Sequence, residues 1–436
     1  MDTSEKREYL LRMIKDETVP AVGCTEPVAV AYAAAVANKY MSTEVKKIDV
    51  MTSKNIFKNG KSVIIPGTKE WGLDLAAVLG SIIGDPDGGL MVLKDVDDKS
   101  VELAHKWIEE KEIKVGYLDK SPNVYVEVCL SSDSEEVKAV LKDDHDNIDR
   151  VYLNGEIVYQ NDEGKNSSND KNYYKTLKEM TFVEIREIIE SYNVDEIRFI
   201  QDGIDINKAA AKRGLSEDSG LNIGRTLFNL QRKGLLGDDE PTNARIFTSA
   251  GSDVRMGGGL CPIMTSGGSG NQGLGVIIPI STVAEARDIS DEKLYKAIFF
   301  GHVLNKYIKL YTGKLSAMCG CAIAAGVGSA AGITWMLGGN DRQIGGACEN
   351  LLSNLAGMIC DGAKDNCAIK LATSAYESVI AAFLALEGVI VNKNIGIVGE
   401  NVEDTIKNLG ILAIEGFAET NNVIVNLYSN CNVMTG

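Results

Sequence analysis

The sequence has no excess of positive charge: 45 Lys and Arg residues against 61 Asp and Glu residues give a net charge of −16. This balance argues against a nucleic acid or an anionic membrane surface as the main partner. Residues 1–17 mix both signs of charge and contain no apolar core of the signal-peptide type. We therefore expect a cytoplasmic protein that binds neither nucleic acid nor membrane.

Long hydrophobic runs are also missing. A long uncharged stretch, between Lys314 and Asp341, consists mainly of Gly, Ala and Ser. It has too few large apolar side chains for a membrane span. This stretch instead predicts a tightly packed, buried helix.

Proline and histidine are scarce, with eight and three residues, whereas glycine is abundant with 44. Glycine without proline favours tight turns and close approach of the backbone to a ligand over a linker protein. The histidines are His105 on a helix face, His145 in the acidic segment DDHD, and His302 before a helical segment. We expect each to be solvated or satisfied in the core, and neither a Ser/His/Asp triad nor a His-rich metal site is indicated.

The chain has nine cysteines, an odd number, and shows no export signal. Both observations argue against a disulfide framework. Cys129, in the strand-like segment NVYVEVCL, is most simply a small buried hydrophobic residue. Five of the nine fall between residues 319 and 367. This crowding requires a separate explanation.

The pattern along the chain predicts an α+β fold. Helical periodicity covers residues 4–16 and 25–39, strand-like and helical runs alternate over 45–160, and Asn154-Gly155 is a hairpin turn signal. Residues 161–172 are polar and of low complexity, as in a linker. We divide the chain into a mixed α/β domain at 1–170, a linker and connecting helix at 171–200, and a mainly helical domain at 201–436.

The segment Gly-Cys-Thr-Glu-Pro at residues 23–27 is the first that could carry chemistry. Thr25 is a good N-cap and Pro27 fits the first turn of a helix, so Cys24 is expected at a helix N-terminus. The helix dipole would lower the pKa of this thiol, which could then act as a base or nucleophile. The alternative is a small residue that fills a helix start.

The second candidate is a glycine-rich stretch, from Ser249 to Gly273, that is uncharged from Met256 onward. Its hydroxyls, amides and glycines could form a nest whose N–H groups bind an anion such as a carboxylate. It lacks the Lys of a phosphate-binding loop. The alternative is a flexible loop.

The third candidate is formed by two cysteine pairs, Cys319 and Cys321, then Cys360 and Cys367. Four thiols could hold zinc or an iron–sulfur cluster, although the spacing matches neither a ferredoxin nor a zinc knuckle. They are expected to converge from the ends of different helices. The alternative is that they are free core cysteines.

With GCTEP, TSGGSGNQG, MCGC and ICDGAKDNC in this order, the chain resembles the L-cysteine desulfidase family, which is related to the iron–sulfur L-serine dehydratases. The resemblance runs from the first helix nearly to the end of the chain. It implies a lyase that converts L-cysteine and water to pyruvate, ammonia and hydrogen sulfide without pyridoxal phosphate.

The resemblance also implies an oxygen-sensitive [4Fe–4S] cluster with three cysteine ligands and one open iron. Cys360 and Cys367 match the two downstream ligands, and the spacing favours Cys319 over Cys321 as the upstream one. Cys24 matches the proposed base. The substrate-holding residues implied by the resemblance are Thr265, Ser266, Gly267, Ser269 and Asn271.

This assignment suits the chemistry of elimination. An open iron can act as a Lewis acid toward the leaving sulfur, a thiolate can remove the α-proton, and loop N–H groups can neutralise the carboxylate. A serine ammonia-lyase with the same cluster is the alternative enzyme, since the sequence does not distinguish a hydroxyl from a thiol leaving group. A pyridoxal enzyme using Lys364 is a more distant alternative.

A non-catalytic redox or iron sensor is the alternative from another class, but its thiols should be exposed, whereas these lie in apolar surroundings. Cys431, close to the end of the chain, is either a plug on the open iron or structural. The expected partner is a small amino-acid substrate. The uncharged helices of the second half also make a homodimer an expectation.

Overall fold

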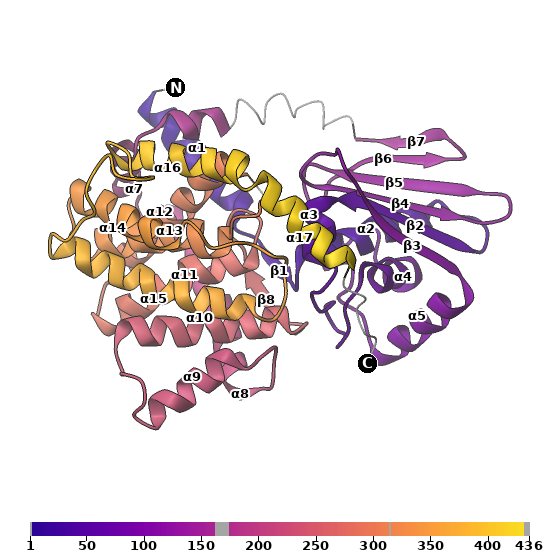
Figure 1. Cartoon of the computed structure of the whole chain (residues 1–436), viewed down its shortest axis with the longest axis horizontal. Coiled ribbons are helices and arrows are strands. Elements are labelled where there is room, and N and C mark those ends of the chain that lie inside the picture. The colour runs from indigo at the N-terminus through magenta and orange to yellow at the C-terminus, as the bar shows by residue number, and fades with distance from the viewer. Residues whose placement is uncertain (1, 162–173, 314, 431–436) are drawn as a thin grey trace.

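A six-stranded sheet and a bundle of helices form the two bodies of the molecule (Figure 1). This computed structural model describes residues 2–161, 174–313 and 315–430. The α+β fold predicted from the sequence is confirmed, with the sheet in the first part of the chain and helices dominating the second. We refer to the two parts as the sheet body and the helical body.

The sheet has the strand order β3-β2-β4-β5-β6-β7. Strands β2 and β3 are parallel and all other neighbours are antiparallel. The strand bounds are β2 Lys47–Ser53, β3 Glu112–Leu118, β4 Tyr125–Ser131, β5 Glu136–Lys142, β6 Ile148–Leu153 and β7 Glu156–Gln160. Alternate residues of β4, such as Val126 and Val128, are fully buried, because one face of the sheet is covered by helices.

Helix α2 (Thr25–Lys39) lies on the sheet against β4 and β5, and α4 (Leu73–Ile83) packs on α2. The remaining elements of the sheet body are α3 (Lys54–Gly60), η1 (Gly89–Met91) and α5 (Asp98–Glu110). Most residues of α2 are buried, and many are alanines, because this helix lies between the sheet and its neighbours. The alanine-rich helix predicted at 25–39 is confirmed.

The predicted hairpin is also confirmed. Asn154 and Gly155 connect β6 to β7, and both have positive φ angles, of 51° and 86°. A two-residue type I′ turn requires this backbone conformation, which Asn and Gly adopt most easily. Cys129 lies in β4 as predicted, but it is only half-buried. Of the predicted linker at 161–172, residues 162–172 lie outside the described residues.

The helical body is built around α13, the predicted buried helix, which packs against α11, α12, α14 and α15. Its small residues permit close contacts: a Cβ on Gly328 would lie 2.4 Å from the carbonyl oxygen of Gly301 in α12. The helices that follow the sheet are α7 Phe182–Glu190, η3 Val194–Ile197, α8 Ile200–Ser216, α9 Ile223–Arg232, α10 Glu240–Met256, α11 Gly270–Ala286, α12 Asp291–Thr312, α13 Gly320–Met336, α14 Asp341–Leu355, α15 Cys367–Leu386, α16 Val402–Ile411, η4 Leu412–Gly416 and α17 Ala418–Asn430.

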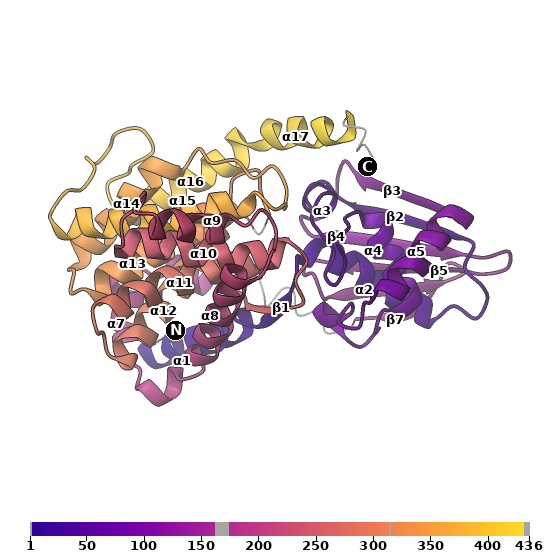
Figure 2. The same ribbon diagram turned by 90° about the horizontal axis from the view of Figure 1, so that it is seen from below.

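Two helices connect the bodies. Helix α1 (Thr3–Glu17) precedes the sheet, yet it packs into the helical core through Leu10 and Met13. The chain then forms β1 (Pro20–Val22), which pairs antiparallel with β8 (Pro262–Met264). At the other end, α17 extends from the helical body to the sheet body, where it contacts α3 (Figure 2). The two bodies are therefore linked at several separate points.

Among the described helices, α15 is long and apolar enough to cross a membrane by length and composition. Half of its most apolar window is buried inside the protein, and it packs against α10, α13 and α14. A core helix passes the same test, so this observation is weak evidence for a membrane span.

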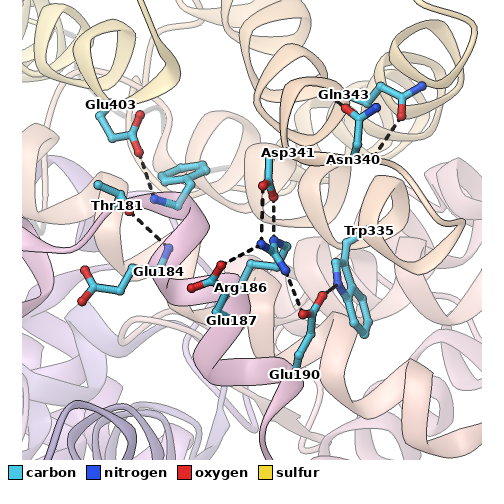
Figure 3. A network of polar contacts seen from close by, with 11 residues as sticks. Thr181, Glu184, Arg186, Glu187, Glu190, Trp335, Asn340, Asp341, Gln343 and Glu403 are labelled. Carbon is cyan, nitrogen blue, oxygen red and sulfur yellow. Dashed lines mark hydrogen bonds and ion pairs between the residues drawn. The ribbon is translucent and has the colours of Figure 1, made fainter. Parts of the chain in front are cut away.

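Arg186 holds α7 against the rest of the helical body (Figure 3). Its Nε donates to Asp341 Oδ1 at 2.6 Å, and its Nη1 donates to Glu190 Oε2 at 2.8 Å. Glu190 also accepts a hydrogen bond from the indole of Trp335 at 2.8 Å. One guanidinium thus ties three helices together.

We expect Arg186→Met to lower the free energy of unfolding by about 1 kcal/mol, because a network of charge-assisted hydrogen bonds contributes more than an isolated surface pair. The change is measured as a fall in the midpoint of thermal unfolding. The control is Arg198→Met, because Arg198 makes a more exposed pair with Asp195. Equal effects of the two substitutions would contradict the prediction.

Candidate active site

Five cysteines from distant parts of the chain line one cavity of about 90 Å³ between the two bodies. They are Cys24, Cys319, Cys321, Cys360 and Cys367. The predicted convergence of the two cysteine pairs is therefore confirmed, and Cys24 joins them. Cys261 and Cys348 are buried elsewhere, and Cys431 lies outside the described residues.

A short backbone pairing brings Cys319 and Cys360 together. The amide of Cys319 donates to the carbonyl of Met358 at 2.9 Å, and the amide of Cys360 donates to the carbonyl of Ala317 at 2.7 Å. Met318 and Ile359 form the antiparallel bridge between these two bonds. This local pairing places the two loops, 317–319 and 358–360, side by side at the cavity.

The N-termini of four helices meet at the same cavity. Cys24 is the N-cap of α2, Ser269 that of α11 and Cys319 that of α13, while Cys367 is the first residue of α15. Unpaired amide groups and the positive end of the helix dipole favour negative charge at such positions. The cavity is therefore suited to an anionic group.

The thiols of Cys319 and Cys367 do not ionise easily by themselves. Burial, followed by the neighbouring thiols Cys321, Cys360 and Cys367, raises the pKa of Cys319 well above its ordinary value. Burial also raises the pKa of Cys367 to about 12. A cationic metal group would compensate for this cost, because thiolates are the species that bind metal.

The donor set fits an iron–sulfur cluster. Soft thiolates are the protein ligands of iron–sulfur clusters and of zinc. Within the part of the chain that the structure describes, no group of three His, Cys, Asp or Glu residues could hold a single metal ion. The four thiols around the cavity have the donor chemistry of an iron–sulfur cluster.

Cys24 lies at the N-terminus of α2 as predicted, but it is the N-cap itself and Thr25 is the first helical residue, so the prediction of Thr25 as N-cap is wrong by one residue. The expected lowering of the pKa of Cys24 is also wrong. Its Sγ donates to Glu26 Oε2 at 2.8 Å, and both side chains are buried. Burial first, and then the negative charge of Glu26, raise the pKa of Cys24 well above its ordinary value. The helix N-terminus does not outweigh these two effects.

Glu26 remains ionised in this environment. Burial would raise the pKa of its carboxyl group, but the charge of His145 and the hydrogen bonds from Cys24 and Asn59 hold that pKa below its ordinary value. The Asn59 amide donates to Glu26 Oε1 at 2.9 Å. Cys24 therefore faces a fixed carboxylate.

The predicted glycine-rich loop contributes to the site only in part. Ser269 and Asn271 line the cavity, as does Gly268. Gly267 and Gly268 have positive φ angles of 55° and 79°, so this turn depends on glycine. The turn closes through paired backbone hydrogen bonds between Ser266 and Ser269.

The other predicted substrate-binding residues lie behind the cavity wall. The Thr265 hydroxyl donates to the carbonyl of Glu17 at 3.1 Å and so ties the loop to the end of α1. Ser266 Oγ lies 2.8 Å from His302 Nδ1. The carbonyl of Gly267 accepts from Lys309 Nζ at 2.5 Å. These contacts support the loop, and Thr265, Ser266 and Gly267 are not among the residues that line the cavity.

Sequence reasoning missed several charged and polar residues that line the cavity. They include Glu26, Asn59, His145, Arg255, Gln272, Lys309 and Lys370. His145 was expected to be solvated or satisfied in the core, but it is buried at the cavity beside Glu26. Its acidic DDHD context is typical of an exposed turn and carries no signal for this position. The sequence does carry a signal for Arg255, because it is the last charged residue before the uncharged glycine-rich stretch.

Lys364, the residue named for a pyridoxal enzyme, does not line this cavity. It makes an ion pair with Asp361 at 2.5 Å, three residues away. Asp361 also pairs with Lys370, which does line the cavity. Lys364 therefore belongs to the support of the loop between Cys360 and Cys367.

Comparison with known proteins places this chain among relatives of similar length. Residues 88–426 match the family described as serine dehydratase alpha chain. A UPF0597 protein of Clostridium botulinum (strain Okra / Type B1) is 52% identical over 427 residues, which cover 98% of each chain. Those of Alkaliphilus oremlandii and Clostridioides difficile are 39% and 37% identical, and cover 97% of this chain and 98% and 99% of their own lengths.

Proposed function

Since the chain belongs to the serine dehydratase alpha chain family, we propose that it is an iron–sulfur lyase that converts L-cysteine to pyruvate, ammonia and hydrogen sulfide. The observation that carries this proposal is the convergence of Cys24 and the two cysteine pairs on one cavity. The family description supports a lyase of the serine dehydratase type. The choice of L-cysteine rests on the resemblance of the four motifs to the L-cysteine desulfidases.

Cys319, Cys360 and Cys367 would hold a [4Fe–4S] cluster. Cys319 and Cys360 are joined by the backbone pairing described above, and Cys367 starts the helix that follows the Cys360 loop. When bound, the cluster with one open iron supplies a Lewis acid for the departing sulfur. The helix N-termini around the cavity would favour its negative charge.

Cys24 would remove the α-proton of the substrate. To do so, its Sγ must be deprotonated, and the positive charge of Arg255 favours the thiolate by lowering the pKa. Loss of the α-proton and of the sulfur as hydrogen sulfide leaves 2-aminoacrylate, which hydrolyses with one water to pyruvate and ammonia. The side chains of Ser269 and Asn271 are placed to orient the substrate.

L-Serine is the second candidate substrate, and the name of the matched family supports it. The segment at residues 23–27 favours cysteine, because the related serine dehydratases carry a loop rich in Ser and His where this chain resembles the desulfidases. As part of the proposal, the partner is a small amino acid, with neither nucleic acid nor membrane involved. We also propose that the protein is cytoplasmic and forms a homodimer.

The test is the iron and acid-labile sulfide content of anaerobically purified protein, followed by product release from L-cysteine and from L-serine. About four irons per chain, with equal release of sulfide and pyruvate from L-cysteine, is the expected result. If the protein contains iron but turns over only L-serine, the proposed substrate changes from L-cysteine to L-serine. Neither iron nor product after cluster reconstitution would refute the proposal.

We expect Glu26→Gln to move the rising limb of kcat/KM against pH to lower pH. The carboxylate raises the pKa of Cys24, so its removal lowers that pKa and increases the thiolate fraction at a given pH. The matched control is Glu102→Gln on the exposed face of α5, which should leave the limb in place. A limb that stays in place or moves to higher pH in Glu26→Gln would show that Cys24 is not the titrating base.

A further inference from the structure

Arg255 is a buried cation that forms no ion pair among the described residues, although its charge acts on Glu26 and Cys24 across the cavity. Its side chain, in the last turn of α10, is only 3% exposed. Its Nε has no hydrogen-bond partner, and Nη1 reaches only the sulfur of Met256, at 3.4 Å. A buried charge is costly unless an opposite charge or good hydrogen bonds compensate for it. Within the described residues the guanidinium has no direct hydrogen bond to a carboxylate, so an anion in the cavity could contact it directly.

The guanidinium lies at the wall of the cavity, against the start of α11. A Cβ at Gly270, the first residue of α11, would lie 2.5 Å from Arg255 Nε. Glycine at this position thus leaves the space that the guanidinium occupies. Arg255 and the amide groups at the N-terminus of α11 consequently border the same part of the cavity.

The nearby carboxylates of the chain are already engaged. Glu26 accepts hydrogen bonds from Cys24 and Asn59. Asp253, two residues before Arg255, accepts from the amide of Gly224 at 2.9 Å. In the described part of the chain, neither Glu26 nor Asp253 forms an ion pair with Arg255. Its charge is available to an anion that enters the cavity.

We propose that Arg255 binds the α-carboxylate of the substrate, assisted by the N-terminus of α11. This inference rests on the proposed function and deepens it, because it makes a free carboxylate a requirement for the substrate. A guanidinium offers a carboxylate two parallel N–H donors, which fixes orientation as well as charge. Thiols that lack a carboxylate, such as cysteamine, are excluded as good ligands.

The first test is turnover of L-cysteine by the cluster-loaded enzyme. Arg255→Gln should raise KM about 10- to 100-fold, as expected when hydrogen bonds between charged groups are lost. Arg255→Lys keeps the charge but not the paired donors, so its KM should lie between those of the wild type and of Arg255→Gln. The control is Arg287→Gln, which alters a half-exposed arginine paired with Glu240. A KM within twofold of the wild-type value for Arg255→Gln would overturn the inference.

The second test measures binding without turnover. Thermal unfolding of the loaded protein is followed with 3-mercaptopropionate, which has a thiol and a carboxylate, and with cysteamine, which has no carboxylate. 3-Mercaptopropionate should raise the midpoint for the wild type and for Arg287→Gln but not for Arg255→Gln. Cysteamine should shift all three proteins equally. Equal stabilisation of Arg255→Gln by 3-mercaptopropionate, or none of the wild type, would overturn the inference.

A third variant covers the case in which Arg255→Gln does not fold. Gly270→Ala keeps the arginine but places a methyl group where the guanidinium lies, so it should reproduce the loss of carboxylate binding. The binding test also separates this inference from the proposed function. If the wild type binds 3-mercaptopropionate through Arg255 but releases no product from L-cysteine or L-serine, the proposed reaction fails and the carboxylate site stands.

Discussion

Replacing Cys24 with serine should lower kcat for L-cysteine by about 10²- to 10⁴-fold, the usual contribution of a general base. Serine is similar in shape, but its hydroxyl ionises far less readily than a thiol, so it cannot accept the α-proton. The loss follows from the position of the sulfur at the cavity beside Glu26. Product release under anaerobic conditions measures it.

The iron content of Cys24→Ser should equal that of the wild type, because Cys24 is not one of the proposed ligands. The matched control is Cys129→Ser. Cys129 is a half-buried thiol in β4 that does not line the cavity. Full turnover in iron-loaded Cys24→Ser would refute the role of Cys24 as base. Loss of iron together with activity would instead identify Cys24 as a ligand.

Replacing Cys319 with alanine should abolish cluster binding, whereas replacing Cys321 with alanine should leave most of it. Cys319 is held next to Cys360 by the backbone pairing of their loops. Cys321 lies in the first turn of α13, where its sulfur is 3.8 Å from the hydroxyl of Ser269. The backbone pairing thus holds Cys319 beside Cys360, whereas Cys321, whose thiol also neighbours Cys360 and Cys367, is not held in this way.

Iron and acid-labile sulfide analysis of the two variants, purified side by side under anaerobic conditions, measures this effect. The wild type should contain about four irons per chain and Cys319→Ala close to none. Thermal unfolding of the iron-free proteins is the control for folding. Iron loss confined to Cys321→Ala would exchange the two assignments, and normal iron in both variants would show that neither is required.

Local features of the fold could be predicted because they depend on neighbouring residues. The hairpin at Asn154-Gly155 follows from the positive φ angles of its turn, and the start of α2 next to Cys24 follows, to within one residue, from Thr25 and Pro27. The buried helix α13 follows from its lack of charge and its small residues. Each of these depends on a few adjacent side chains.

The ionisation of Cys24 could not be predicted in the same way. A helix N-terminus is local, and so is the hydrogen bond to Glu26 two residues away, but the burial of the thiol depends on the residues of the helical body that line the same cavity. Similarly, His145 comes from a polar segment that sequence reasoning assigned to solvent or to the core. Thr265 and Ser266 were expected to bind substrate because they belong to the glycine-rich loop. Their hydroxyls instead form hydrogen bonds with Glu17 and His302, which support that loop.

The sequence by itself determined the fold class, the two cysteine pairs and the glycine-rich loop, because composition, periodicity and motif order carry that information. Only the tertiary structure decided which side chains meet at the cavity. Residues 24–26, 255 and 319–367 are brought together by packing between the two bodies, and that packing sets burial and the distances between charges. Since pKa values and ligand binding depend on burial and distance, the chemistry of the site is a property of the folded chain.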